Sequence, residues 1–229
     1  MAKYEIKDGV AILPEGIEMI EDEAFKNCKE LKRVVIPQWV RRIGDDAFWG
    51  CENLEVVELP EWLEDIGHGA FEGCSSLKEL TLPQWVKRIE GDAFWNCSSL
   101  QNLSIPSSVT YIGNCAFYGC SSLQNLFIPS SVTHIGNGAS EGCSSLIRIK
   151  VDSNNPVYDS REGCNAIIHT ESNTLISGCS NTIIPPSVTS IGDCAFDGCE
   201  SLTLVKVSKN TELEEDAFED CPNVEIERY

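Results

Sequence analysis

A cysteine recurs every 23 residues through the first 143 residues of this 229-residue chain. Each of these cysteines closes the phrase A-F-x-x-C or a near variant of it. The positions are Cys28, Cys51, Cys74, Cys97, Cys120 and Cys143. A fixed period of this length is typical of solenoids, in which one coil cannot bury its apolar edge alone and a stack of coils can. The sequence therefore predicts one elongated body whose core grows coil by coil.

Each repeat contains a short apolar string that ends at a proline, as in Leu77 to Leu82 before Pro83. The string predicts a strand, which ends at the proline because that residue has no backbone N–H. The chain then turns through V-x-x-I-G, and the alanine and phenylalanine that follow are expected to pack the far wall. Phenylalanines form a ladder that is interrupted at Ser140. Its members are Phe25, Phe48, Phe71, Phe94, Phe117, Phe196 and Phe218.

One segment departs from the period, because Pro129 and Pro185 stand 56 residues apart instead of 46. Short apolar runs at 167–168 and 175–176 flank a polar turn, which predicts a hairpin insert. We expect a single domain over 1–229. Its parts are an N-terminal cap and first coil at 1–30, regular 23-residue coils at 31–151, an irregular coil with the hairpin insert at 152–182, and the last coils with a C-terminal cap at 183–229.

Charge and hydropathy exclude several classes of partner. The formal net charge is −19, which opposes binding to phosphate backbones and to anionic membrane surfaces, so we expect no nucleic acid partner. No apolar run approaches the roughly 18 residues of a membrane span, so no membrane insertion is expected. The polar start, Met1 to Tyr4, predicts no signal peptide in this chain, which leaves the compartment open. The acidic charge is also explained simply by solubility of a long surface.

Most of the 12 cysteines share one slot of the repeat, beside the phenylalanine. This position favours free, buried thiols that act as small apolar groups, although stacked coils also bring equivalent residues close enough for disulfides. A zinc site is not expected, because the chain has no C-x-x-C pair and no histidine cluster. We predict no metal and no cofactor.

Two segments share the words I-P-S-S-V-T-x-I-G-x-x-A-F-x-G-C, at 105–120 and, with Pro186 for the first serine, at 184–199. Together with the N-N-P-V-Y-D-S-R run of the insert, they resemble the BspA-like leucine-rich repeats of bacterial surface proteins. The resemblance covers nearly the whole chain. It implies a mainly β leucine-rich repeat solenoid, a right-handed arc with a parallel β-sheet on the concave face and short strands and turns on the convex side. It also implies adhesion to host proteins and a cell-surface or secreted location.

The chain departs from that pattern where tryptophan replaces serine after three successive prolines. These residues, Trp39, Trp62 and Trp85, precede inward-facing apolar residues and should be exposed. We expect them to form a partner-binding aromatic surface together with Trp49, Trp95 and Tyr118, because tryptophan is enriched at interface hot spots. The alternative is a self-stacked ladder that merely shields the coil turns.

Phe127, on an outward position of its strand, marks a second and smaller candidate contact. We expect the outward positions of the strands to form the usual binding surface of a solenoid. The partner would be a protein or a glycan, and the chain a monomer or a weakly self-associating protein.

Catalysis is not expected. The histidines, His68, His134 and His169, occupy unrelated slots, and no phosphate loop, metal motif or nucleophile motif is present. Three functions remain open: a surface or secreted binding module of adhesin type, a cytoplasmic interaction scaffold, and an engineered or recombined leucine-rich repeat with no native ligand.

Overall fold

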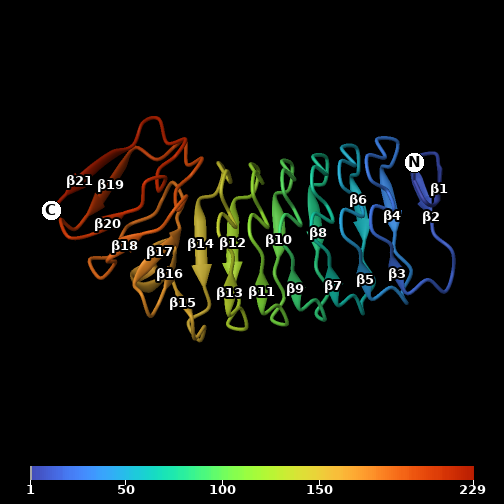
Figure 1. The fold of residues 1–229 in the computed structure, drawn as a ribbon, viewed down its shortest axis with the longest axis horizontal. Helices are drawn as coiled ribbons and strands as arrows, with labels where there is room; N and C mark the ends of the chain where they lie inside the picture. Colours follow the sequence, from blue (N-terminus) through green and yellow to red (C-terminus); the bar gives the residue numbers. More distant parts are fainter. Residues whose placement is uncertain (1) are drawn as a thin grey trace.

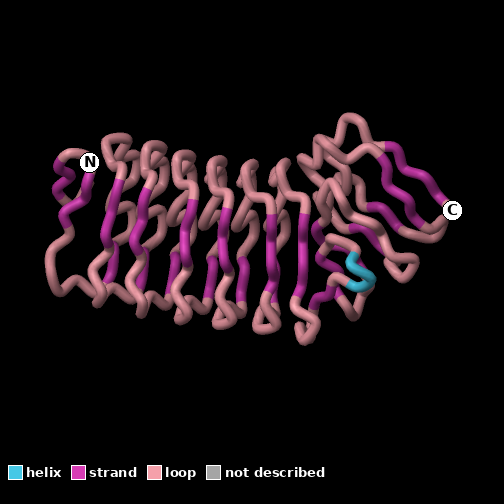
Figure 2. The backbone as a smooth tube through the Cα atoms, turned by 180° about the vertical axis from the view of Figure 1, so that it is seen from behind, coloured by secondary structure: helices cyan, strands magenta, loops and turns pink. Residues whose placement is uncertain are grey.

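The computed structural model describes residues 2–229 and forms a mostly-β parallel solenoid (Figures 1 and 2). Met1, the first residue of the polar start discussed above, lies outside the described residues. The fold class predicted from the sequence is confirmed. Within 2–229, no helix has the length and apolar character of a membrane span.

One row of strands runs along the stack (Figure 1). Its regular members are β4 (Arg33–Val35), β6 (Val56–Glu58), β8 (Glu79–Thr81), β10 (Asn102–Ser104), β12 (Asn125–Ile128) and β14 (Arg148–Val151). Its strands expose alternate side chains to solvent, as the burial of β8, β10 and β12 shows. The paired strands are parallel and in register by one period, as in Asn125 opposite Arg148. At the N-terminal end, β1 (Glu5–Lys7) and β2 (Val10–Ile12) form an antiparallel hairpin that pairs with β4 and caps the row.

A second sheet of two-residue strands lines the other side of each coil. Its order is β3 (Met19–Ile20), β5 (Arg42–Ile43), β7 (Asp65–Ile66), β9 (Arg88–Ile89), β11 (Tyr111–Ile112) and β13 (His134–Ile135), all parallel. In four of these six strands a glycine follows the isoleucine and lets the coils approach closely. A Cβ on Gly67 would lie 2.7 Å from the carbonyl carbon of Gly44, so only glycine fits there without a backbone shift.

The expected phenylalanine ladder fills the core between the two sheets. Phe25, Phe48, Phe71 and Phe94 are fully buried, and consecutive rings in this run stack at centroid distances of 5.2, 5.2 and 5.6 Å. The cysteine slot lies beside the ladder, and all twelve cysteines of the described chain are free thiols. Cys97 shows the pattern, because its Sγ donates to the carbonyl oxygen of Phe71 at 3.1 Å. From Cys51 to Cys143, the thiols of this slot thus act as small buried groups with a satisfied weak donor.

The ladder is interrupted at Ser140, as the sequence indicates. Ser140 Oγ lies 2.5 Å from Ser177 Oγ, a hydrogen bond between the regular stack and the insert. Beyond it, the Phe196 ring packs so closely on Gly178 that a Cβ there would lie 2.2 Å from the ring. The ladder then resumes as a stacked pair, Phe196 and Phe218, at 5.0 Å.

The segment after β14 contains the predicted hairpin and the last coils. Its elements are β15 (Tyr158–Asp159), the 3₁₀ helix η1 (Arg161–Gly163), β16 (Ile167–His169), β17 (Thr174–Ser177), β18 (Ser190–Ile191), β19 (Leu204–Val207), β20 (Glu212–Leu213) and β21 (Glu225–Arg228). Strands β16 and β17 pair antiparallel, and β17, β18 and β20 continue in parallel. Figure 1 shows β19 and β21 inclined to the row from β4 to β14, and the buried core divides into two clusters at this junction. The short helix η1 lies between these two parts (Figure 2).

Candidate functional site

The first candidate surface is the tryptophan column, which we define as Trp39, Trp62 and Trp85. The residue that follows each indole, Val40, Leu63 or Val86, is fully buried in the core. The tryptophan before it therefore points away from the core. The indoles are 67%, 41% and 48% exposed, respectively. The sequence correctly predicted that they would be exposed.

Ring contacts within this column are partial. Trp62 and Trp85 stack with centroids 5.4 Å apart, and the Arg41 guanidinium lies 5.7 Å from the Trp62 ring centroid. Trp39 takes no part in the aromatic stacking found within residues 2–229. Charged side chains border the indoles, with Glu64 positioned 3.9 Å from Arg41 and 3.4 Å from Lys87. The result is an apolar strip with a mixed-charge rim.

The structure separates Trp49, Trp95 and Tyr118 from the tryptophan column. They lie in the connections that lead from the second sheet back to the strand row, whereas the column lies in the opposite connections of the coil (Figure 1). Trp95 and Tyr118 stack at 4.1 Å, and Lys26 Nζ lies 5.0 Å from the Trp49 ring centroid. All three rings are half-buried. The one aromatic surface expected from the sequence is therefore two surfaces.

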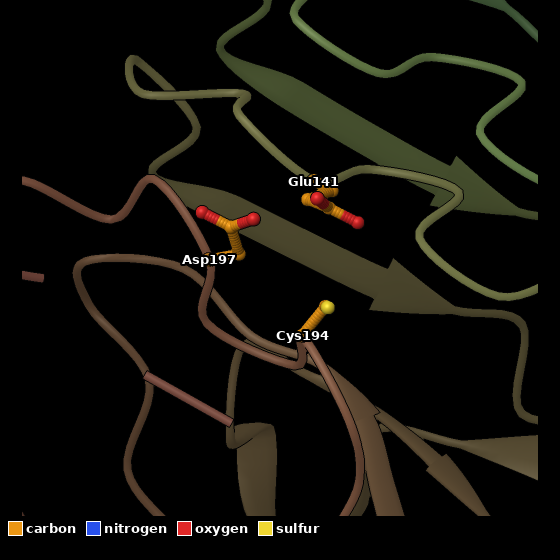
Figure 3. A group of neighbouring side chains, drawn as sticks. All are labelled: Glu141, Cys194 and Asp197. Atoms are coloured by element: carbon orange, nitrogen blue, oxygen red, sulfur yellow. The ribbon is translucent and has the colours of Figure 1, made fainter. Parts of the chain in front are cut away.

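Acidic residues continue the slot of Trp95 and Tyr118 in the later coils. Glu141 and Asp197 come together across the insert, with Cys194 beside them (Figure 3). Potential ligand atoms of these three half-buried side chains lie within 4.8 Å of one another. Burial and a hydrogen bond with Asp197 raise the pKa of Glu141 to about 8.

This acidic cluster is the one group of three potential metal ligands within residues 2–229. A proton held on Glu141 at neutral pH satisfies the carboxyl pair without an ion, which fits the raised pKa. The sequence analysis missed the cluster. The available signal was that Glu141 and Asp197 occupy the same slot, 56 residues apart, the same displacement that separates Pro129 from Pro185.

The second candidate surface is the strand face, defined as the two outward columns of the strand row. The first column is Arg33, Val56, Glu79, Asn102, Asn125 and Arg148, and the second is Val35, Glu58, Thr81, Ser104, Phe127 and Lys150. All twelve side chains are exposed, as expected for a solenoid. Their chemistry changes along the stack from charged and aliphatic, through amide and hydroxyl, to aromatic and cationic.

Two hollows adjoin on this face at Phe127, which is 44% exposed. One, of about 450 Å³, lies over Thr81, Asn102 and Ser104. The other, of about 650 Å³, lies between β14 and η1 and contains Arg148 and Lys150. Sequence reasoning found Phe127 but not the larger hollow, because the insert that closes it has no counterpart in the regular coils.

The three histidines do not form a reactive group. His68 Nε2 lies 3.1 Å from Asp92 Oδ2, His134 stacks on Tyr111 at 4.6 Å, and His169 Nδ1 lies 3.0 Å from Ser172 Oγ. Each histidine thus has its own local partner in a different coil.

Comparison with known families confirms the resemblance seen in the sequence. The family described as "BspA type Leucine rich repeat region" matches six copies, over residues 9–98, 64–164 and 167–227. No curated protein matches the chain.

Solved structures of bacterial leucine-rich repeat proteins share the fold. A leucine rich cell surface protein from Faecalibacterium prausnitzii is 27% identical, with a TM-score of 0.74 over 98% of this chain and 70% of that one. The pneumococcal vaccine antigen PcpA is 23% identical, with a TM-score of 0.74 over 86% of this chain and 50% of that one. A leucine-rich repeat protein from Eubacterium ventriosum is 20% identical, with a TM-score of 0.58 over 94% and 59%. This chain thus spans only part of each relative.

Proposed function

This chain belongs to the BspA type leucine-rich repeat family, and we propose that it is a non-enzymatic binding module of a bacterial surface protein that recognises a protein partner through the tryptophan column. The surface location is suggested by the F. prausnitzii relative, which is described as a cell surface protein. An adhesin-like role follows if the partner belongs to another cell.

The observation that carries the proposal is the exposure of three indoles in one column of successive coils. Trp39 is 67% exposed, and the Trp62–Trp85 pair keeps 41% and 48% of its surface in water. Burying such rings removes much apolar area at a small loss of side-chain freedom, which is why tryptophan dominates interface energetics. A mixed-charge rim around an apolar centre is the usual composition of a protein-protein contact.

The test replaces all three tryptophans by serine, the residue found in this slot in the next two coils, at Ser108 and Ser131. Immobilised wild-type and W39S/W62S/W85S proteins are compared for quantitative retention of proteins from host and bacterial cell surfaces, and their self-association is measured by sedimentation. We expect any specific partner retained by the wild type to bind the variant at least roughly thirtyfold more weakly, since a hot-spot tryptophan contributes about 2 kcal/mol or more.

The control is Ile183→Ser, which removes a 75% exposed apolar side chain from another part of the surface. It should retain the same partners as the wild type. Far-ultraviolet circular dichroism and the unfolding midpoint verify that both variants are folded. If the triple variant keeps the wild-type partners and the wild-type association state, the tryptophan column is not the binding site.

A further inference from the structure

The larger hollow on the strand face carries an unbalanced positive charge in a strongly acidic protein. Arg148 and Lys150 lie on adjacent outward positions of β14 and both line this hollow. Within residues 2–229, neither side chain has a carboxylate oxygen within 4.0 Å, whereas Arg33 of the strand row and Arg42 and Arg88 of the second sheet each have one. These two cations thus stay unpaired even though the chain carries a net charge of −19.

The acids at the rim of this hollow are already engaged. Burial alone would raise the pKa of Asp159, but hydrogen bonds from Arg161 more than offset it, and the pKa is lowered. The Arg161 guanidinium makes contacts of 2.8 and 2.6 Å to the two oxygens of that carboxylate. Asp152 accepts from the backbone N–H of Asn154 at 2.9 Å. With Asp159 paired to Arg161, the lining keeps the two positive charges of Arg148 and Lys150 against the one negative charge of Asp152, so the hollow has a net positive charge.

The main chain at the edge of β14 is closed to an added peptide strand. The Val151 N–H donates to Ser160 Oγ at 3.0 Å, and the Ile147 carbonyl accepts from Asn181 Nδ2 at 3.4 Å. Ile149, between them, is only 2% exposed. Recognition at this hollow must consequently come from side chains rather than from strand addition.

The neighbouring hollow supplies the side chains that suit a sugar. Asn102 and Asn125 each offer an amide donor and acceptor, and Ser104 offers a hydroxyl, on exposed positions of β10 and β12. Phe127 stands between the two hollows and lines both. An exposed aromatic face beside amides and hydroxyls can pack on the apolar face of a sugar ring while its hydroxyls are hydrogen-bonded.

We propose that the strand face from Thr81 to Lys150 binds an acidic oligosaccharide, with a sugar carboxylate held by Arg148 and Lys150, a ring packed on Phe127, and further hydroxyls bonded by Asn125, Asn102 and Ser104. A guanidinium binds a carboxylate in a two-bond geometry, and such charge-assisted bonds are roughly twice as strong as neutral ones. This site goes beyond the proposed protein-binding role, because it takes a ligand of a different class. It shares no residue with the tryptophan column, so the two fail independently.

The experiment measures binding of an oligogalacturonate of six sugars to the full chain by calorimetry at low salt. Neutral maltohexaose and hexaglutamate of the same length are the comparison probes. We expect saturable binding of oligogalacturonate, at least about tenfold weaker binding of both other probes, and a decrease in affinity as salt rises. R148Q/K150Q should weaken oligogalacturonate binding about tenfold or more, and F127S by several-fold.

The matched control is K7Q/K209Q, which removes two positive charges from exposed positions outside the strand face. It should bind like the wild type, as should W39S/W62S/W85S. If R148Q/K150Q and K7Q/K209Q lose affinity for oligogalacturonate equally, net charge alone explains the effect and the proposed site is wrong. Tighter binding of hexaglutamate would assign the hollow to acidic peptides instead, and no binding of oligogalacturonate would reject the proposal while leaving the tryptophan column untouched.

Discussion

The coils of the first half and the coils that follow form the same turn with different residues. After the proline, Trp39, Trp62 and Trp85 point into solvent, whereas Ser108 and Ser131 occupy the same slot and turn back on the stack. Ser108 Oγ donates to the Val86 carbonyl at 2.7 Å, and Ser131 Oγ donates to the Val109 carbonyl at 2.6 Å. The serines thus bond one coil to the previous one.

This difference separates what the fold requires from what it tolerates. The serine coils show that the turn is complete with a small hydroxyl and an inter-coil hydrogen bond. In the tryptophan coils this bond is replaced by exposed aromatic area, which a stable turn does not need. A residue that reduces inter-coil bonding and leaves an indole in water is better explained by an interaction with a partner than by stability.

A second slot also differs between the two regions in the chemistry of its side chains. The position after the core phenylalanine, or after Ser140 where the ladder is interrupted, is mixed in the early coils and acidic in the later ones. It holds Lys26, Trp49, Glu72, Trp95 and Tyr118 in the early coils, and Glu141, Asp197 and Glu219 in the later ones. Of the early rings, Trp95 and Tyr118 stack at 4.1 Å, while the later carboxyls of Glu141 and Asp197 come within reach of each other and the pKa of Glu141 is raised to about 8. The slot thus carries stacked rings in two regular coils and a carboxyl pair where the insert meets the stack.

The largest expected effect tests whether the two regions share one core. Phe71→Ala, in a tryptophan coil, and Phe117→Ala, in a serine coil, each remove a ring that is at most 1% exposed. We expect each to lower the free energy of unfolding by about 3–5 kcal/mol, because a cavity replaces stacked ring contacts. Urea denaturation measures both. A clearly smaller loss at Phe117, which has a ring neighbour on only one side, would show that the core already weakens toward Ser140.

The regular part of this fold could be predicted from the sequence because its constraints repeat. Burial of Phe48, Phe71 and Phe94, the free thiols and the exposed tryptophans all follow from one period, since a slot that is buried in one coil is buried in the next. The hairpin at Ile167 was also predictable, from two apolar runs around a polar turn.

The rest depends on how the insert returns the chain to the stack, which no repeated slot encodes. The Glu141–Asp197 contact and the hollow that holds Arg148 both arise where the insert meets the last regular coil. The separation of Trp49 from the tryptophan column could have been predicted from the order of the two connections within one coil. It was missed because the aromatics were grouped by residue type rather than by connection.

The next largest effect is a pH dependence of stability that arises from Glu141 in the second slot. The pKa of Glu141 is raised to about 8, so the unfolded chain loses this proton first as pH increases above the ordinary glutamate range. The stabilisation is present at low pH and is lost as pH rises through about 8. We expect the free energy of unfolding to fall by roughly 1–2 kcal/mol across this window, a discounted figure because the group is partly exposed to solvent.

Glu141→Gln should flatten this pH dependence, since the amide still bonds Asp197 but does not titrate. Denaturation curves at several pH values between 4 and 9 provide the measurement, with the exposed Glu200→Gln as a matched control that keeps the wild-type slope. An identical slope in the Glu141→Gln protein would contradict the raised pKa of Glu141 as the source of this pH dependence.

A smaller effect is expected at the serines of the first slot. Ser108→Ala removes the hydroxyl that bonds the Val86 carbonyl and should lower the free energy of unfolding by about 1 kcal/mol. Ser107→Ala, at the adjacent exposed position, is the matched control and should change stability by no more than about 0.5 kcal/mol. Equal effects of the two substitutions would mean that the Ser108 hydroxyl does not stabilise the turn through its bond to the preceding coil.

The smallest expected effect is the most informative about function. Trp62→Ser loses the stack on Trp85 and the contact with Arg41, and it gains the hydroxyl that serine coils use to bond the preceding coil. These terms are each about 1 kcal/mol and oppose one another, so we expect unfolding free energy to change by less than about 1 kcal/mol. Urea denaturation of Trp62→Ser, beside Ser108→Trp as the reverse exchange, measures the balance. If Trp62→Ser costs as much as Phe71→Ala, the tryptophan column is part of the fold, and the exposed indoles then serve to shield the coil turns rather than to bind a partner.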